Sequence, residues 1–257
     1  MKLNRAKTLE GYTLDSLDGD IGKVKDFYFD DQYWTVRYLV VDAGTWLTAS
    51  QVLISPYALI AVDSIEKSIS VNLSKKQIEN SPSLNTDKPV TRQYEDAYYG
   101  YYGWPSYWEG ASMWGEYSSI MRDPTRWGIS NEGGKVWDSH LRSTQSVSGY
   151  HIQASDGDIG HVSDFIIDDE SWAIRYLVVD TQNWWAGKKV LIAPKWIDSV
   201  SWPKSKIIVN LTLETIKEAP EYTDVFLLNR EYEKRLHQHY NCTEYWDEDL
   251  FPKGVTK

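Results

Sequence analysis

The sequence predicts a mainly β protein built from two tandem small β-barrels, each followed by short helices. Shifting the chain by 138 positions aligns residues 11–82 with 149–220 without a gap, and 31 of the 72 pairs are identical. Within each copy, short runs rich in Val, Ile, Leu, Phe and Tyr follow one another closely, as in small barrels and sandwiches. A repeat of this length indicates a duplicated domain, because solenoid units run about 20–50 residues.

The repeat also divides the chain of 257 residues into three parts. The register extends from Leu3, which pairs with Leu141, to Trp108, which pairs with Trp246. We therefore expect a first barrel unit with a trailing aromatic helix over 1–108, an aromatic-containing connector over 109–140, and a second unit with its trailing helix over 141–257. The connector is rich in Gly and Ser but also carries three tryptophans. We expect it to run along the protein surface with those rings tucked in.

The strands of the first copy follow from local patterns. Residues 68–73 alternate apolar and polar side chains, as a half-buried strand does. Asp30, Asp31 and Gln32 separate two apolar runs and read as a turn. The alternation breaks around Asp26, which predicts a β-bulge. The predicted strands are residues 12–14, 22–30, 34–42, 52–54, 59–62 and 68–73.

Two helices are expected after those strands. Ser74 with Gln77 forms a capping-box pattern, and Pro82 marks the end of that helix. A second helix is predicted from Arg92 to Tyr102, because four tyrosines recur at helical spacing. These tyrosines are Tyr94, Tyr98, Tyr101 and Tyr102.

Charge, cysteine content and hydropathy disfavour several classes of partner and location. The net charge of -10, from 37 acidic and 27 basic residues, disfavours nucleic acid and anionic lipid. Cys242 is the single cysteine, so no intrachain disulfide can form. The N-terminal residues have no apolar signal-peptide core, and no run approaches the roughly 18 apolar residues of a membrane span. We therefore expect a soluble, cytoplasmic protein without cofactor or bound metal.

The aspartates of the repeated line DGDIG, at 18–22 and 156–160, invite a catalytic or metal-binding interpretation. A calcium loop starting at Asp18 would need an acidic residue at position 22 and a glutamate at position 29, but these are Gly22 and Phe29. Asp-Gly pairs supply the left-handed backbone of tight turns, and Asp side chains accept nearby backbone amides. We therefore favour turn chemistry over a cation site.

Other charged or metal-ligating residues have structural interpretations too. Arg37 and Asp42, like Arg175 and Asp180, flank apolar strand residues, which favours a buried or rim ion pair over catalysis.

The His237, His239 and Cys242 cluster lacks the four matched ligands of a zinc site, and the first copy has aromatic residues at those positions. We expect these side chains to extend the aromatic helix face. No nucleophile elbow, phosphate loop or zinc-protease motif occurs, so we predict no catalytic residues.

The aromatic stretch YYGYYGWPSYW, which begins at Tyr98, is the strongest candidate for a binding surface. Tyrosine and tryptophan are typical anchors of protein interfaces. We expect Tyr94, Tyr98 and Tyr102 to pack against their own barrel. Residues off that stripe, together with the matching end of the second copy, are predicted to bind a partner: Tyr99, Trp104, Tyr107, Trp108, Tyr245 and Trp246.

An ordered set of segments, present twice, resembles the PRC-barrel domain. The first copy has the DGDIG turn, the RYLVVD strand, the VLISP strand and the SISVNL strand with its short helix, and the second copy repeats this order. The resemblance implies a small β-barrel that acts as a docking module, as in the H subunit of photosynthetic reaction centres and a ribosome maturation factor. This chain shows neither the membrane helix of the former nor the N-terminal domain of the latter. The resemblance implies no catalytic residues.

The sequence thus favours a non-catalytic scaffold or adaptor that binds a protein partner, or itself as a homodimer. One alternative is a ligand-binding or hydrolytic protein with carboxylates such as Asp18, Asp20 and Asp42 in a groove between the barrels. Another is an accessory factor of a photosynthetic or electron-transport complex, which rests on analogy alone.

Overall fold

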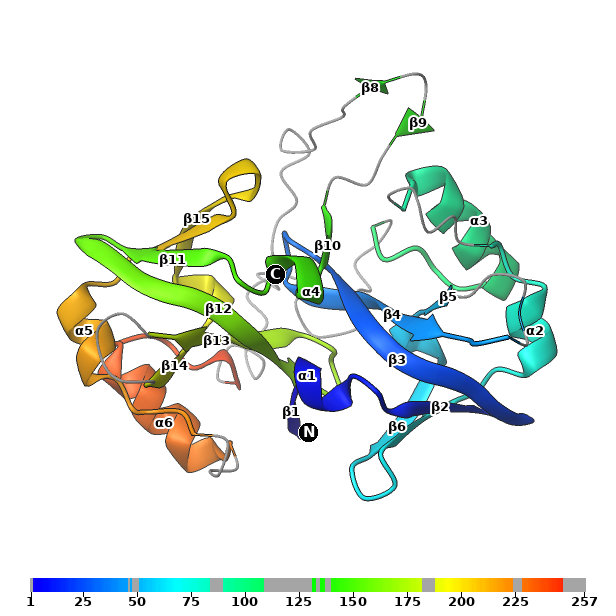
Figure 1. Ribbon diagram of the computed structural model, residues 1–257, viewed down its shortest axis with the longest axis horizontal. Coiled ribbons are helices and arrows are strands. Elements are labelled where there is room, and N and C mark those ends of the chain that lie inside the picture. Colours follow the sequence, from blue (N-terminus) through cyan, green and yellow to red (C-terminus); the bar gives the residue numbers. More distant parts are fainter. Residues whose placement is uncertain are drawn as a thin grey trace, which may run out of the picture. The chain divides into compact units, whose positions relative to one another are not determined.

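The protein was analysed as a computed structural model that describes residues 2–45, 47, 51–83, 90–108, 131–132, 135–136, 140–181, 188–223 and 228–246. Two seven-stranded sheets dominate the described residues, and the helices are short (Figure 1). This confirms the predicted class of two tandem β domains. Much of the predicted connector, including Trp114, Trp127 and Trp137, lies outside the described residues. None of the described helices is long and apolar enough to cross a membrane.

The first sheet has the strand order β5-β4-β3-β2-β7-β6, with β10 paired to β3 beside this path. It is mostly antiparallel, but β2 and β7 run parallel. The path is open, since no ladder joins β5 to β6 among the described residues. The strands are β2 (Thr13–Ser16), β3 (Gly19–Asp30), β4 (Thr35–Asp42), β5 (Gln51–Ile54), β6 (Leu59–Asp63), β7 (Ser68–Val71) and β10 (Leu141–Ser143).

The second sheet repeats this topology, with the order β14-β13-β12-β11-β16-β15 and β1 paired to β12. Its strands are β1 (Leu3–Arg5), β11 (His151–Ala154), β12 (Gly157–Asp168), β13 (Ile174–Asp180), β14 (Lys189–Ile192), β15 (Ile197–Ser201) and β16 (Lys206–Val209). The central strands β4 and β13 are buried along almost their whole length. That burial explains why RYLVVD recurs in both copies with little alternation.

Short helices connect and extend the strands. Each predicted helix of the first copy is present, and Ser74 and Gln77 form both bonds of the predicted capping box. The helices are α1 (Ala6–Leu9), η1 (Pro56–Ala58), α2 (Lys75–Glu79), α3 (Arg92–Tyr102), α4 (Thr144–Val147), η3 (Pro194–Trp196), η4 (Trp202–Lys204), α5 (Leu213–Glu218) and α6 (Arg230–His239). A two-stranded ribbon of β8 (Asn131–Glu132) and β9 (Lys135–Val136) is described by its backbone alone.

The predicted bulge in the long strand is confirmed. The register between β3 and β4 shifts between Val24 and Asp26, and β12 shifts at the matching position. Asp26 accepts a hydrogen bond from the backbone amide of Phe27 at 2.7 Å, and Asp164 accepts one from Phe165 at 2.8 Å. Each bulge therefore turns an aspartate back onto its own strand.

The two copies exchange their first strands. β1 comes from the start of the first copy but pairs with β12 of the second, while β10 from the second copy pairs with β3 of the first (Figure 1). One compact unit accordingly contains Met1–Lys7, Thr144–Asp168 and Ile174–Lys257, and the other contains Thr8–Ser143 and Asp169–Ala173.

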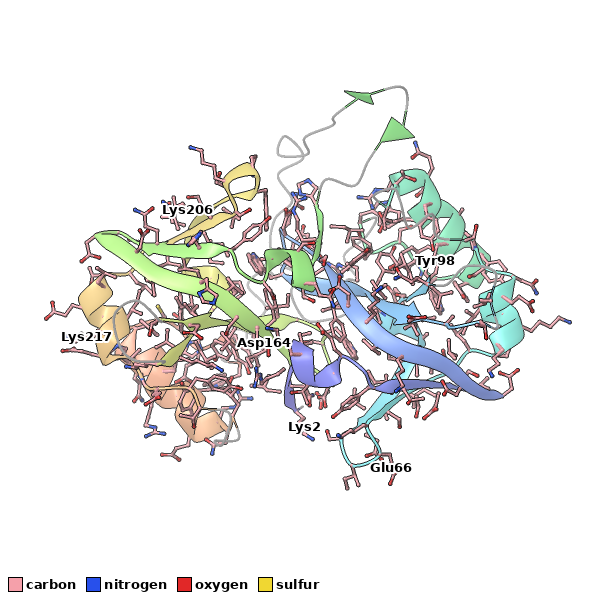
Figure 2. The ribbon with its side chains drawn as sticks, viewed as in Figure 1. Lys2, Glu66, Tyr98, Asp164, Lys206 and Lys217 are labelled. Carbon is pink, nitrogen blue, oxygen red and sulfur yellow. The ribbon has the colours of Figure 1, made fainter. Side chains whose placement is uncertain are left out.

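Side chains hold each exchanged strand in place. Arg5 donates from Nε to Asp164 Oδ2 at 2.7 Å, and the side chain of Asp164 is almost wholly buried (labelled in Figure 2). Ser143 donates to the equivalent carboxylate, that of Asp26. Asp31 accepts from Arg142 Nε at 2.9 Å. The carboxylate at each bulge thus binds the strand supplied by the other copy.

A disulfide can test this exchange in the full chain. Ser143 and Tyr28 are Cα partners in the β10–β3 ladder. With Cys242→Ser to remove the native thiol, Tyr28→Cys with Ser143→Cys is expected to form an intramolecular disulfide, detected by non-reducing electrophoresis and peptide mass spectrometry.

The matched control is Tyr28→Cys with Arg5→Cys. Residue 5 occupies the position of residue 143 in the repeat, so this pair would cross-link only if each first strand stayed with its own copy. A disulfide in the control pair, or disulfide-linked dimers in the test pair, would contradict the exchange.

Candidate functional site

A buried glutamate organises the aromatic end of the first copy. Glu95 lies on α3 and is fully buried. Its Oε1 accepts hydrogen bonds from Tyr38 at 2.7 Å and from Tyr107 at 2.9 Å, while Arg92 Nη1 lies 3.1 Å from Oε2. These bonds tie the residues after α3 to the central strand β4. A buried carboxylate needs such partners because desolvation disfavours an unpaired charge.

Arginines stack on the aromatic rings beside this glutamate. The guanidinium of Arg37 lies 4.3 Å from the ring centre of Tyr107, and that of Arg92 lies 3.9 Å from the ring of Trp108. We call Arg37, Arg92, Glu95, Tyr107 and Trp108 the first glutamate cluster. It fixes Trp108 by ring stacking rather than by burial, since Trp108 remains partly exposed.

The second copy builds the same cluster from Arg175, Arg230, Glu233, Tyr245 and Trp246. Tyr245 donates to Glu233 Oε1 at 2.8 Å and Tyr176 donates to it at 3.0 Å. Arg175 and Arg230 stack on Tyr245 and Trp246 at 4.1 and 4.0 Å. Burial raises the pKa of Glu233, although the Tyr245 hydrogen bond and Arg230 oppose this effect.

The structure separates the six predicted partner-binding residues into two groups. Tyr99, Tyr107 and Tyr245 are buried within their own units. The tryptophans are partly exposed: Trp104, Trp108 and Trp246.

Tyr99 is buried although it lies beside the predicted tyrosine stripe. Residues 95, 98, 99 and 102 share the helix face that meets the sheet, and Tyr99 packs at 6.3 Å from Tyr38 and 5.4 Å from Trp108. Glu95 on this face was not foreseen, because glutamate is rarely buried. The sequence signal for this buried glutamate is that Arg92, Glu95 and Tyr107 recur in the second copy as Arg230, Glu233 and Tyr245.

Tyr98 is fully buried within its own unit, where it was predicted to pack (labelled in Figure 2). Its hydroxyl donates to the carbonyl of Leu53 and accepts from the amide of Ser55, both at 3.0 Å. The helix is therefore bonded to the end of β5 as well as to β4. Tyr101 is the member of the stripe that remains exposed, at 42%.

The first aspartate of each DGDIG line accepts a backbone amide, as predicted, but that amide lies 57 residues away and not in the same turn. Asp18 accepts from the amide of Lys75 at 2.7 Å, which lowers its pKa, and Asp156 accepts from the amide of Leu213 at 2.8 Å. Each therefore fixes the start of the helix that follows the last strand of its own sheet. Asp42 accepts from the amide of Gly44 at 2.9 Å.

The predicted ion pair has a different acidic partner. Arg37 is fully buried and donates from Nε to Asp30, not to Asp42, which is exposed. Arg175 likewise donates to Asp168, with Nη2 at 2.7 Å from Oδ2. The reason is that Asp30 lies on the adjacent antiparallel strand, while Asp42 lies at the far end of β4. Burial raises the pKa of Asp30 despite the nearby guanidinium.

The His/Cys cluster of the second copy belongs to the aromatic packing. His237 Nε2 lies 3.0 Å from the hydroxyl of Tyr176, and its Nδ1 lies 3.0 Å from the carbonyl of Thr243. His239 Nε2 contacts the carbonyl of Thr215 at 2.7 Å. In the part of the chain that is described, no three His, Cys, Asp or Glu side chains are grouped to hold a metal ion.

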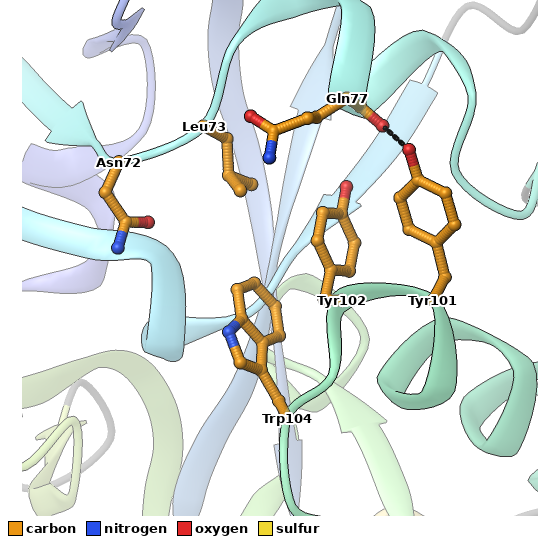
Figure 3. Close-up of a pocket in the computed structure, with 6 residues that line it drawn as sticks. All are labelled: Asn72, Leu73, Gln77, Tyr101, Tyr102 and Trp104. Atoms are coloured by element: carbon orange, nitrogen blue, oxygen red, sulfur yellow. Dashed lines mark hydrogen bonds between the residues drawn. The ribbon is translucent and has the colours of Figure 1, made fainter.

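A pocket of about 350 Å³ opens where the end of α3 faces α2 in the first copy. Figure 3 shows its six lining residues, all of which are neutral: Asn72, Leu73, Gln77, Tyr101, Tyr102 and Trp104. Sequence reasoning singled out Trp104 as an interface residue but gave no sign of this pocket, because its walls come from three separate elements.

Comparison with known sequences agrees with this architecture. A sequence model described as the PRC-barrel domain matches residues 1–78 and 146–216, one match in each copy. A search of curated proteins found no match. The two matches span more than half of the chain, and they cover both DGDIG turns and both RYLVVD strands. The chain therefore belongs to the PRC-barrel domain family, with the domain present in two copies.

Proposed function

We propose that the protein is a non-catalytic, cytoplasmic scaffold or adaptor that binds a protein partner through its partly exposed tryptophans. The observation that carries this proposal is the duplicated glutamate cluster, which holds Trp108 and Trp246 against arginine side chains in both copies. Trp104 is also partly exposed, but it stacks on a tyrosine ring and not on an arginine.

Held tryptophans suit an interface for a physical reason. Binding residues that are already fixed lose little conformational freedom on association, so more of their buried apolar area contributes to affinity. Large aromatic residues and arginine are also the side chains that most often dominate interface energies. Arg92 and Arg230 stack on the two tryptophans at 3.9 and 4.0 Å, which combines both features at each cluster.

Several carboxylates that an enzyme could use have structural tasks. Asp18, Asp42 and Asp156 accept backbone amides, and Asp30 and Asp168 pair with buried arginines. Glu95 and Glu233 accept two phenolic hydroxyls each. These bonds give the named carboxylates a role in holding the fold, which favours a scaffold over a hydrolase.

Site-specific photo-cross-linking tests the adaptor role in the full chain. p-Benzoylphenylalanine replaces Trp108 or Trp246 and is irradiated in a lysate of the native host. We expect both positions to capture the same protein species, identified by mass spectrometry, and purified wild-type protein to compete with the capture.

The control position is Ile65, which is 89% exposed and lies outside the clusters. Circular dichroism establishes that each variant is folded. The proposal is wrong if positions 108 and 246 give no adduct, or only the adducts that position 65 gives.

A further inference from the structure

The pocket of the first copy has properties that point to one class of ligand. Its volume of about 350 Å³ falls at the small end of the range for ligand sites. The residues come from the segment that follows β7, from α2, and from the end of α3 with the segment that follows it. Because no lining side chain is charged, the pocket offers no counter-ion to a phosphate or a carboxylate.

Hydrogen-bond donors in the pocket outnumber free acceptors. Within the described residues, no hydrogen bond occupies the indole N–H of Trp104 or the side-chain amide N–H groups of Asn72. Burial raises the pKa of Tyr102 to about 12, so its hydroxyl keeps its proton. The Tyr102 hydroxyl interacts with that of Ser81, which donates its own proton to the carbonyl of Ile78 at 2.8 Å, so the free donors are those of Trp104 and Asn72.

The main acceptors on the opposite wall are already engaged. Gln77 Oε1 accepts from the amide of Ser74 at 2.9 Å as part of the capping box, and the Gln77 carbonyl accepts from Tyr101 at 2.9 Å (Figure 3). A ligand for this pocket should therefore be rich in acceptors and poor in donors.

Stacked tyrosine rings cover the indole of Trp104. Trp104 stacks on Tyr102 with ring centres 4.4 Å apart and an angle of 12°, and it also stacks on Tyr57 at 5.7 Å. A sugar ring needs an uncovered aromatic face, so this stacking disfavours a carbohydrate.

We propose that this pocket binds a proline-rich segment of the protein partner in the polyproline II conformation. Such a segment exposes carbonyl acceptors that have no internal hydrogen bond, and each proline lacks an N–H donor. Aromatic-lined grooves with a few donors recognise this conformation in other domains. The inference rests on the proposed adaptor function and assigns the chemistry of the partner.

The second copy provides an internal comparison. Its residues at the matching positions include Thr215 in place of Gln77 and Cys242 in place of Trp104. There Trp196, from η3, packs against Tyr240 at 4.6 Å. The free indole N–H of Trp104 therefore has no counterpart at position 242, and we expect one peptide per chain.

Titration calorimetry of the full chain tests the proposal with defined probes. Acetylated, amidated decaproline and (Ala-Pro)₅ are compared with a Gly-Ser decapeptide and with cellohexaose. We expect at least one proline peptide to bind with a stoichiometry of one and a dissociation constant below about 1 mM, and the other two probes not to bind.

Matched variants locate the binding. Trp104→Phe removes the indole N–H and part of the ring, and Tyr102→Phe removes a hydroxyl and keeps the ring, so we expect each to lower affinity by about 3- to 10-fold. Tyr240→Phe and Asn210→Ala change the equivalent positions of the second copy and should leave affinity unchanged. Circular dichroism verifies folding in each case.

Two results would overturn the inference. One is the absence of binding by both proline peptides at about 5 mM, or binding of cellohexaose instead. The other is equal weakening by the first-copy and second-copy variants. Neither result would affect cross-linking from positions 108 and 246, so the adaptor function would survive the loss of this inference.

Discussion

Gly22→Ala is expected to unfold the compact unit that contains β3, and Gly160→Ala the unit that contains β12. Gly22 has φ +149° and Gly160 has φ +156°. A Cβ at Gly22 would lie 2.0 Å from the backbone oxygen of Asp42, and one at Gly160 would lie 2.0 Å from that of Asp180. Because both obstacles are backbone atoms of the neighbouring strand, relief requires opening the ladder. We expect a loss of at least about 3 kcal/mol in the free energy of unfolding.

Gly11→Ala and Gly149→Ala are the matched controls. These glycines also have positive φ, +83° and +91°, but a Cβ at either would meet nothing within 4 Å. Each control should lose only about 1–2 kcal/mol from backbone strain. Urea unfolding followed by circular dichroism measures all four variants. Equal losses in the Gly22 and Gly11 variants would refute the close-approach argument.

The glycine prediction explains why the chain carries the DGDIG line twice. The aspartate at its start fixes the helix that follows the last strand, through Lys75 in one copy and Leu213 in the other. The glycine at its end lets the long strand approach its neighbour. Each residue type is thus required by the scaffold, and no chemistry on a ligand is needed to account for the repetition.

Local structure was predictable where residues close together in the sequence determine it. The helix Arg92–Tyr102 has the predicted bounds, because the Thr91 cap and the tyrosine spacing are both local. The bulge at Asp26 was predictable because an acidic residue interrupts an apolar run. The first sheet contains every strand predicted for the first copy, with bounds that differ by a few residues.

Non-local pairing was not predictable by the same reasoning. The sequence of β1 or β10 does not say which copy it will join, because Leu3–Arg5 and Leu141–Ser143 are both short and occupy equivalent repeat positions. The partner of Arg37 depends on the cross-strand register, which places Asp30 within reach.

The backbone conformation of two tryptophans was not predictable either. Trp34 and Trp172 adopt positive φ of 52° and 58°, although bulky residues rarely do so.

The candidate site was likewise predictable only in part. Aromatic richness marked the right segments, but exposure depended on where Glu95 and Glu233 sit. Each glutamate draws a tyrosine of the following segment inward and leaves its neighbouring tryptophan partly exposed. A search for periodic apolar residues treats a glutamate as a surface position, so it misses the group that determines the arrangement.

Glu95→Ala and Glu233→Ala are each expected to lower the free energy of unfolding of their unit by about 3–5 kcal/mol. Removing Glu95 leaves the hydroxyls of Tyr38 and Tyr107 without their shared acceptor and leaves a void at a fully buried position. Glu95→Gln is the matched control, because its amide oxygen can still accept from a phenol. It should lose about 1–2 kcal/mol, and an equal loss in both variants would show that the hydrogen bonds contribute little.

The second copy adds a dependence on pH with a definite sign. Burial raises the pKa of Glu233 above its ordinary value of 4.5, so the folded state holds this proton more tightly than the unfolded state. The contribution of Glu233 to stability is therefore fully present below pH 4.5 and falls as the pH rises through the raised pKa. Glu233→Gln cannot titrate. Measured by urea unfolding across this window, the stability of the wild type relative to Glu233→Gln should decrease with rising pH. An increase would mean that Arg230 and the two tyrosines outweigh burial, and that the cluster stabilises the charged carboxylate.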